Sequence, residues 1–302
     1  MSSHGRPIGP TLLATAFCVA LWLAGPSFAA QANAPAAAPA ADKKQKISVG
    51  TEIELIMPAK ADRGHIFYRE LLREALSAAG YEPRIHLTQP VPPPRAVLML
   101  DRGEASIHPM FATPERDARY TPVRVDLTEG LIAKRILLVP KGQAIRFAKV
   151  RTLADFRASG AVGAFGSGWY DTEIWRANDL GAMVIEGDWS SIYGMLSHGG
   201  RGFDYFSRGL TEISTDERLH PELDVEQNLL FTYEGDFRFY LSASASRYRD
   251  VIEDSLKKAV ASGLLHKLIV KHFSGDLDKY RLASRTVLKL TSPAALPSRG
   301  AR

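Results

Sequence analysis

An arginine in a short polar turn is the first residue whose type and position suggest chemistry. Arg116 closes the tetrapeptide Thr113-Pro114-Glu115-Arg116, which follows a predicted strand at 105–109. In open α/β sheets the ligand crevice lies beyond the carboxyl ends of the strands, so Thr113 and Arg116 stand where binding side chains are expected. A guanidinium pairs with a carboxylate through two parallel hydrogen bonds. Arg116 is therefore a candidate ligand-binding residue; the alternative is a surface arginine in a charged turn.

A second group of candidate residues precedes a predicted helix at 170–178. Ser167 and Gly168 come directly before this helix, where unpaired backbone N–H groups and the helix dipole favour an anion. Simple capping by Ser167 or Asp171 is the alternative. Trp169 either stacks on a ligand at the edge of a cleft or packs in a core.

Two further candidates, Tyr205 and Arg208, lie at the end of the predicted strand at 203–206. We expect Arg208 and Arg116 to face one cleft from opposite sides. Burying two guanidinium groups without partners would cost several kcal/mol each, so this arrangement predicts an anionic ligand. If Arg208 instead pairs with Asp204 or Glu212, the charge of the ligand stays open.

Motifs for catalysis or metal binding are absent from the sequence. The histidines show no H-E-x-x-H spacing, and no G-x-S-x-G motif occurs. The glycines at 199–202 follow a predicted helix and precede a strand, which is the reverse of a dinucleotide-binding loop. The one cysteine, Cys18, lies in an N-terminal apolar run. We expect no catalytic residue, no metal and no cofactor.

Composition and chain ends indicate a secreted protein of two lobes. The 302 residues suffice for two cores, and the net charge of +5 is scattered rather than clustered, which argues against nucleic acid as a partner. Residues 1–29 resemble a cleaved signal peptide, with an apolar run followed by small residues. Residues 30–45 form an Ala/Pro linker, and residues 291–302 form a flexible tail. We therefore predict a periplasmic location.

The order of predicted elements favours an α/β fold with parallel strands. Strands at 46–51, 81–87 and 105–109 alternate with helices at 66–79 and 95–100, and a second such series begins near residue 153. Long extended segments at 123–139 and 223–241 read as crossings between lobes. We expect lobe I to comprise 46–140 and 234–290, and lobe II to comprise 141–233.

The ordered motifs resemble those of type 2 periplasmic solute-binding proteins, the amino-acid-binding branch of extracellular family 3. The motifs in question are the stretch 103–107, the T-x-x-R of 113–116, the run 137–139, the pair Gly166-Ser167, the stretch 202–205 and the closing segment 262–273. The resemblance implies two α/β lobes joined by two extended crossings, with a ligand between them and closure by hinge motion. It also implies that Arg116 holds the ligand's carboxylate.

The chain departs from that family at four positions. Ser106 stands where the family's G-x-[IV]-D pattern has its aspartate. The family's ammonium-binding aspartate has no counterpart in Ser207-Arg208-Gly209, Leu55 replaces an aromatic residue, and Phe111 replaces a serine. Asp171 or Glu212 are candidates to replace the missing acid.

The sequence therefore predicts a monomeric binding protein, not an enzyme, that captures a small polar, anionic or amino-acid-like solute for an ABC-type permease. Two alternatives stay open. One is a sensing module of the same fold that signals to a membrane partner, and the other is a lyase that uses cleft carboxylates.

Overall fold

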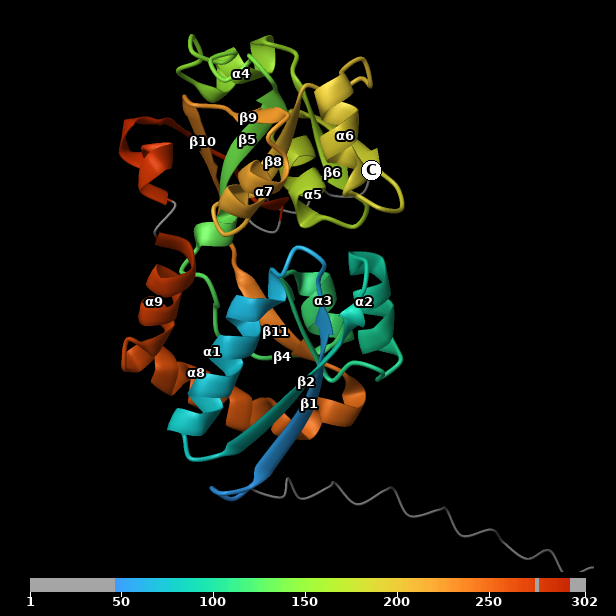
Figure 1. Ribbon diagram of the computed structural model, residues 1–302, viewed down its shortest axis with the longest axis vertical. Helices are drawn as coiled ribbons and strands as arrows, with labels where there is room; N and C mark the ends of the chain where they lie inside the picture. Colours follow the sequence, from blue (N-terminus) through green and yellow to red (C-terminus); the bar gives the residue numbers. More distant parts are fainter. Residues whose placement is uncertain (1–46, 275–276, 294–302) are drawn as a thin grey trace, which may run out of the picture. The chain divides into compact units, whose positions relative to one another are not determined.

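The computed structural model describes residues 47–274 and 277–293. These described residues all belong to one compact unit. The predicted signal peptide, the linker and residues 294–302 of the predicted tail lie outside the described residues. The architecture is mixed α/β with two lobes, as predicted (Figure 1).

The first lobe holds a parallel pair of strands, β1 and β2, and a three-stranded sheet of order β3-β11-β4. The backbone N–H of Ser106 donates to the carbonyl of Ile56, which ties the start of β3 to β1. The strands of this lobe are β1 (Glu52–Ala59), β2 (Glu82–Pro90), β3 (Ile107–Phe111), β4 (Thr121–Pro122) and β11 (Phe237–Leu241). Its helices are α1 (His65–Ala78), α2 (Pro93–Asp101), α3 (Pro114–Arg119), η2 (Ala243–Tyr248), α8 (Arg249–Ala261), α9 (Leu264–Ile269) and the π-helix η3 (Val270–Ser274).

The first strand lies later in the chain than its predicted range of 46–51. Gly50 adopts a left-handed turn (φ +84°), and its N–H donates to the carbonyl of Gly80. The strand that follows alternates buried Ile53, Leu55 and Met57 with exposed residues. The prediction was wrong because a turn with a strand-like composition precedes the real alternation.

The second lobe is built on a seven-stranded sheet of order β12-β10-β5-β8-β6-β7, with β9 paired to β5. Strands β6, β7 and β8 are mutually parallel, so their carboxyl ends share one edge. The strands are β5 (Lys134–Pro140), β6 (Val162–Gly166), β7 (Gly181–Ile185), β8 (Tyr205–Gly209), β9 (Leu223–Val225), β10 (Leu229–Thr232) and β12 (Thr286–Lys289). The helices are η1 (Leu131–Ala133), α4 (Leu153–Ala158), α5 (Tyr170–Ala177), α6 (Ser191–His198), α7 (Ile213–Leu219), η4 (Asp278–Tyr280) and η5 (Leu282–Ser284).

Apolar periodicity explains how the helices cover these sheets. Helix α1 buries Phe67, Leu71, Leu72 and Leu76 at helical spacing, in one core with Ile252 of α8. In the second lobe one cluster gathers on the α4 and α5 side of the sheet and another on the α6 and α7 side. Each lobe therefore has a core of its own, so its cleft-facing loops rest on fixed elements.

The chain passes between the lobes through the two predicted crossings, before β5 and between β10 and β11, and then makes a third passage. After η3 it returns to the second lobe, where β12 pairs in parallel with β10. The predicted bounds gave both Lys134–Pro140 and Thr286–Lys289 to lobe I, yet both strands belong to the second sheet. We propose that lobe II begins near residue 131 and includes residues 277–293.

Candidate functional site

Arg116 links the two lobes through backbone carbonyl groups. Thr113 caps helix α3, and its hydroxyl accepts the N–H of Arg116 at 3.2 Å. The guanidinium donates from Nη1 to the carbonyl of Phe111 at 2.7 Å and from Nη2 to the carbonyl of Gly168 at 3.2 Å. Burial lowers the pKa of Arg116 from its ordinary value. Since Arg116 and Phe111 belong to the first lobe and Gly168 to the second, the bond to Gly168 joins the lobes here, and the bond to Phe111 holds the guanidinium in place within its own lobe.

A cavity of about 260 Å³ opens beside this arginine, and we name it the Arg116 cavity. Both lobes contribute to its walls. Its lining residues are Thr113, Pro114, Glu115, Arg116, Gly168, Tyr170, Glu173 and Pro293. The volume is near the lower end for small-molecule sites, which suits a small solute.

An aromatic contact also joins the lobes next to Arg116. The ring of Phe111 stacks on Tyr170 of the second lobe, with centroids 5.5 Å apart and planes at 27°. It also meets the edge of Phe237. A Cβ at Gly235 would overlap the Phe111 ring, so this close approach requires glycine. Phe111 therefore fills space between the lobes.

The start of helix α5 differs from the predicted anion site. The N–H of Ser167 donates to Ile185 and that of Trp169 donates to Gly166, so neither is free for a ligand. The Trp169 ring stacks on Phe206 inside the second lobe, with centroids 5.8 Å apart. Of this predicted group, Gly168 reaches the Arg116 cavity, and it offers a carbonyl rather than an N–H.

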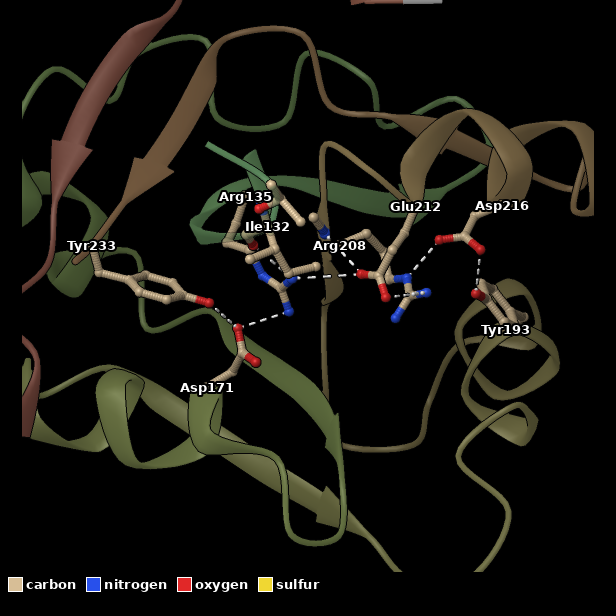
Figure 2. Close-up of polar contacts among 10 residues, drawn as sticks. Ile132, Arg135, Asp171, Tyr193, Arg208, Glu212, Asp216 and Tyr233 are labelled. Carbon is tan, nitrogen blue, oxygen red and sulfur yellow. Dashed lines mark hydrogen bonds and ion pairs between the residues drawn. The ribbon is translucent and has the colours of Figure 1, made fainter. Parts of the chain in front are cut away.

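Arg208 is paired within its own lobe, as Figure 2 shows. Its Nε donates to Oδ2 of Asp216 at 2.5 Å, and its Nη2 lies 3.4 Å from Oε1 of Glu212. Asp216 also accepts the hydroxyl of Tyr193 at 2.7 Å. The side chain of Arg208 is 1% exposed. The prediction that Arg208 faces a ligand without a protein partner is therefore wrong, and the argument for an anionic ligand that rested on it fails.

A second buried arginine, absent from our sequence-based candidates, completes this network. Arg135 places Nη2 2.7 Å from Oδ1 of Asp171 and Nη1 3.5 Å from Oε2 of Glu212 (Figure 2). The hydroxyl of Tyr233 donates to Asp171 at 2.6 Å. Asp171, predicted as a ligand residue, instead ties α5 to β5 and to the end of β10.

The pKa values of the two acids nearest Arg208, Glu212 and Asp216, shift in opposite directions. Burial alone would raise the pKa of Glu212, but the guanidinium groups of Arg208 and Arg135 bring it below its ordinary value. Burial raises the pKa of Asp216, and Arg208 offsets this only in part. Glu212 is thus the firmly ionised member, and at 27% side-chain exposure it is the most solvent-accessible of the five charged groups.

Tyr205 lies in the core rather than at the mouth of a cleft. The residue is fully buried, and its hydroxyl accepts the indole N–H of Trp175 at 2.8 Å. Its position on β8 turns the side chain toward Phe156 of α4. This contradicts its predicted role in ligand binding.

A second interlobe cavity, of about 240 Å³, lies between the β1–α1 loop and the start of α7, and we name it the Lys60 cavity. Lys60, Arg63 and Arg218 line it together with the acids Asp62, Glu212 and Asp216. The remaining walls are mainly apolar or aromatic. They comprise Gly64, Ile66, Phe67, Tyr68, Thr211, Thr215, Phe237, His272 and Phe273.

Sequence reasoning named Glu212 but missed the cations of the Lys60 cavity, for an identifiable reason. Lys60 and Arg63 directly follow the carboxyl end of β1, where the crevice rule would have placed them. The misplaced first strand hid that signal. No comparable sequence signal identifies Arg135. An arginine beside an apolar run is ordinarily interpreted as the solvent-exposed end of a strand.

Comparison with solved structures identifies the fold of the chain that forms these cavities. An amino acid ABC transporter substrate-binding protein from Streptococcus pneumoniae, bound to L-arginine, matches with a TM-score of 0.55 and 13% identity, over 73% of this chain and 94% of that one. A periplasmic binding protein with high arginine specificity from Salmonella typhimurium gives a TM-score of 0.54 and 13% identity, over 73% and 99%. A mutant of ArgBP from T. maritima gives 0.53 and 17%, over 73% and 95%.

The chain has the type 2 periplasmic-binding-protein fold. No family model and no curated protein matches the sequence. The predicted fold is confirmed, and the neighbours in this periplasmic-binding-protein fold are substrate-binding proteins of ABC transporters.

Two further observations bear on the class of protein. Among residues 47–274 and 277–293, no three His, Cys, Asp or Glu side chains come together in a way that could hold a metal ion. No helix within the same ranges is long and apolar enough to cross a membrane.

Proposed function

We propose that this chain captures a small polar solute, anionic or amino-acid-like, between its lobes and presents it to an ABC-type membrane permease. The observation that carries the proposal is the pair of interlobe cavities, each lined by polar side chains from both lobes. A solute that touches both lobes at once stabilises the closed arrangement, which is the signal that a membrane partner can recognise. The neighbours in the fold, which are ABC transporter proteins, support the same function.

Arg116 is the residue that we propose to bind the solute's carboxylate. It lies in a cavity wall, and its guanidinium already bonds an oxygen of the opposite lobe. When the lobes separate, the carbonyl of Gly168 leaves Arg116, and a ligand carboxylate can take its place with a stronger, charge-assisted bond. We further propose that the chain acts as a monomer and is secreted by means of residues 1–29.

The test is a binding screen with matched arginine variants. Native mass spectrometry and thermal shifts would scan amino acids, organic acids and inorganic anions against the purified protein. A ligand at about a hundred times its dissociation constant should stabilise the fold by roughly 2.7 kcal/mol. Arg116→Gln should weaken the binding of the best ligand by roughly tenfold to a hundredfold.

Arg119→Gln, on the same helix but paired with Asp101, is the control and should bind like the parent. A screen in which no small solute stabilises the protein would contradict the proposed function. Equal affinities of Arg116→Gln and Arg119→Gln would remove Arg116 from the site.

A further inference from the structure

In the Lys60 cavity the cationic side chains lack strong protein partners in the described part of the chain, whereas the carboxylates have them. Within the described residues, the side chains of Lys60 and Arg63 form no hydrogen bond and no ion pair, and Arg218 contacts only the hydroxyl of Thr215, at 3.5 Å. These three cations come from both lobes and line one cavity. Lys60 is half-buried and Arg63 and Arg218 are exposed, so each can pair with an anion that enters the cavity, and their summed charge attracts one.

The acids of the same cavity are, in contrast, already engaged. Glu212 lies between the guanidinium groups of Arg208 and Arg135, and Asp216 accepts from Arg208 and Tyr193 (Figure 2). The carboxylate of Asp62 accepts the N–H of Gly64 at 2.8 Å. A cationic ligand would therefore have to compete with protein donors for each of these carboxylates.

The charges of the cavity and its supporting network sum to a surplus of positive charge. The cations are Lys60, Arg63, Arg135, Arg208 and Arg218, and the carboxylates are Asp62, Asp171, Glu212 and Asp216. Five cationic groups thus face four carboxylates. Lys60 is close enough to Glu212 to lower its pKa, so the positive charge of the first lobe acts across the cavity.

Local backbone structure adds to the preference for an anion. Helix α1 begins at the cavity, its first turn contains no acidic residue, and no side chain caps it. Its N-terminal N–H groups and dipole therefore favour negative charge there. Arg63 holds a left-handed conformation (φ +63°) that non-glycine residues rarely adopt. The Oγ1 of Thr211, buried in the opposite wall, has no hydrogen-bond partner.

We propose that the Lys60 cavity binds a carboxylate or phosphate group of the solute, held by Lys60 of the first lobe and Arg218 of the second. This inference rests on the proposed function and adds to it the class of ligand and a second binding position apart from Arg116. An anion between cations of the two lobes removes the surplus charge and stabilises the closed form.

The experiment is a calorimetric titration of the full chain with citrate, succinate, inorganic phosphate and L-arginine. The parent is compared with Lys60→Gln, with Arg218→Gln and with Lys149→Gln, an exposed control outside both cavities. Each of the first two variants should weaken the anion that binds most tightly by about tenfold, equivalent to about 1.4 kcal/mol, while the control keeps the parent affinity. The ligand-free melting temperature of Lys60→Gln should match that of the parent, because the side chain of Lys60 has no hydrogen-bond or ion-pair partner among the described residues to lose, and the backbone bonds of Lys60 are kept.

Each other outcome overturns the inference. Anions that bind equally well to Lys60→Gln and to the control would place the anion elsewhere in the cleft and leave the proposed function intact. Tighter binding of L-arginine than of any anion, unaffected by Lys60→Gln, would show that the engaged carboxylates decide the ligand's charge. If none of the anions binds but the broader screen finds another solute, the anion site is rejected and the proposed function is not. Only a broader screen without any ligand contradicts the proposed function itself.

Discussion

Replacing Asp216 tests whether the buried network holds the second lobe together. Asp216 is 3% exposed and receives two hydrogen bonds, from Arg208 at 2.5 Å and from Tyr193 at 2.7 Å. In Asp216→Asn the amide keeps one acceptor oxygen but loses the negative charge. Its NH₂ group must then face either the guanidinium, which cannot accept a hydrogen bond, or the tyrosine hydroxyl, which can. Arg208 thus keeps one bond and loses its nearest counter-charge.

The size of the effect follows from what remains around Arg208. Removing the only partner of a buried ion costs about 3–5 kcal/mol. Here Glu212 stays within 3.4 Å of Nη2, but Arg135 shares it and it is more exposed. We therefore expect Asp216→Asn to lower the free energy of unfolding by about 2–4 kcal/mol. That is a large fraction of the roughly 5–15 kcal/mol typical of a folded protein.

The assay can report on the second lobe selectively. The tryptophans of the described residues, Trp169, Trp175 and Trp189, all belong to that lobe. Urea unfolding followed by tryptophan fluorescence therefore measures the second lobe, and far-ultraviolet circular dichroism measures both lobes together. Glu186→Gln, an exposed acid in the same lobe, is the matched control.

A second substitution distinguishes the ion pair from a general loss of packing. Tyr193→Phe removes one hydrogen bond to Asp216 and keeps the ring that stacks on His220. The effects of Asp216→Asn and Tyr193→Phe should be less than additive, because the Tyr193 hydroxyl bonds a charged carboxylate in the parent and only a neutral amide in Asp216→Asn. If Asp216→Asn shifts the urea midpoint no more than Glu186→Gln does, the network contributes nothing measurable and the reasoning fails.

Two further predictions concern pH and the interlobe contact. Burial, with the charges of Lys60 and Arg116, lowers the pKa of His108 from 6.5 to about 3, so the unfolded chain binds a proton there that the folded chain does not. The free energy of unfolding should therefore fall as the pH drops below about 6.5, by about 2 kcal/mol at about pH 5. Urea titrations at several pH values should show that this free energy depends less on pH in His108→Gln than in the parent. An equal pH dependence in the two proteins would contradict the prediction. Gly235→Ala should cost about 2–4 kcal/mol, because the new Cβ overlaps Phe111 in addition to straining the backbone at φ +136°. Gly160→Ala, at φ +64° with nothing nearby, should cost only about 1–2 kcal/mol in the same unfolding assay, and equal losses would rule out the overlap.

Local sequence signals predicted many of the elements but few of the contacts at the candidate site. The apolar spacing of 66–79 predicted helix α1, because burial on one helical face depends on neighbours three and four residues apart. The stretch 113–116 predicted a polar turn beyond a strand, and the structure has helix α3 there, capped by the side chain of Thr113. Tyr205, in contrast, was assigned to a cleft because a strand end alone does not show which face of a sheet its side chain meets.

What the sequence determined by itself is therefore the α/β order, the two-lobed fold and the place of Arg116 just beyond a strand, since these follow from apolar periodicity and from the ordered motifs that carry the family resemblance. The tertiary structure alone decided the partners of the charged groups. The bond from Arg116 to Gly168 spans 52 positions, and the one from Tyr233 to Asp171 spans 62. Such pairs form only when the fold brings distant elements together, and the energy of each pair depends on how far the surrounding structure excludes water. Whether an arginine is free to bind an anion, as proposed for the Lys60 cavity, or is neutralised internally like Arg208, is thus a property of the folded chain.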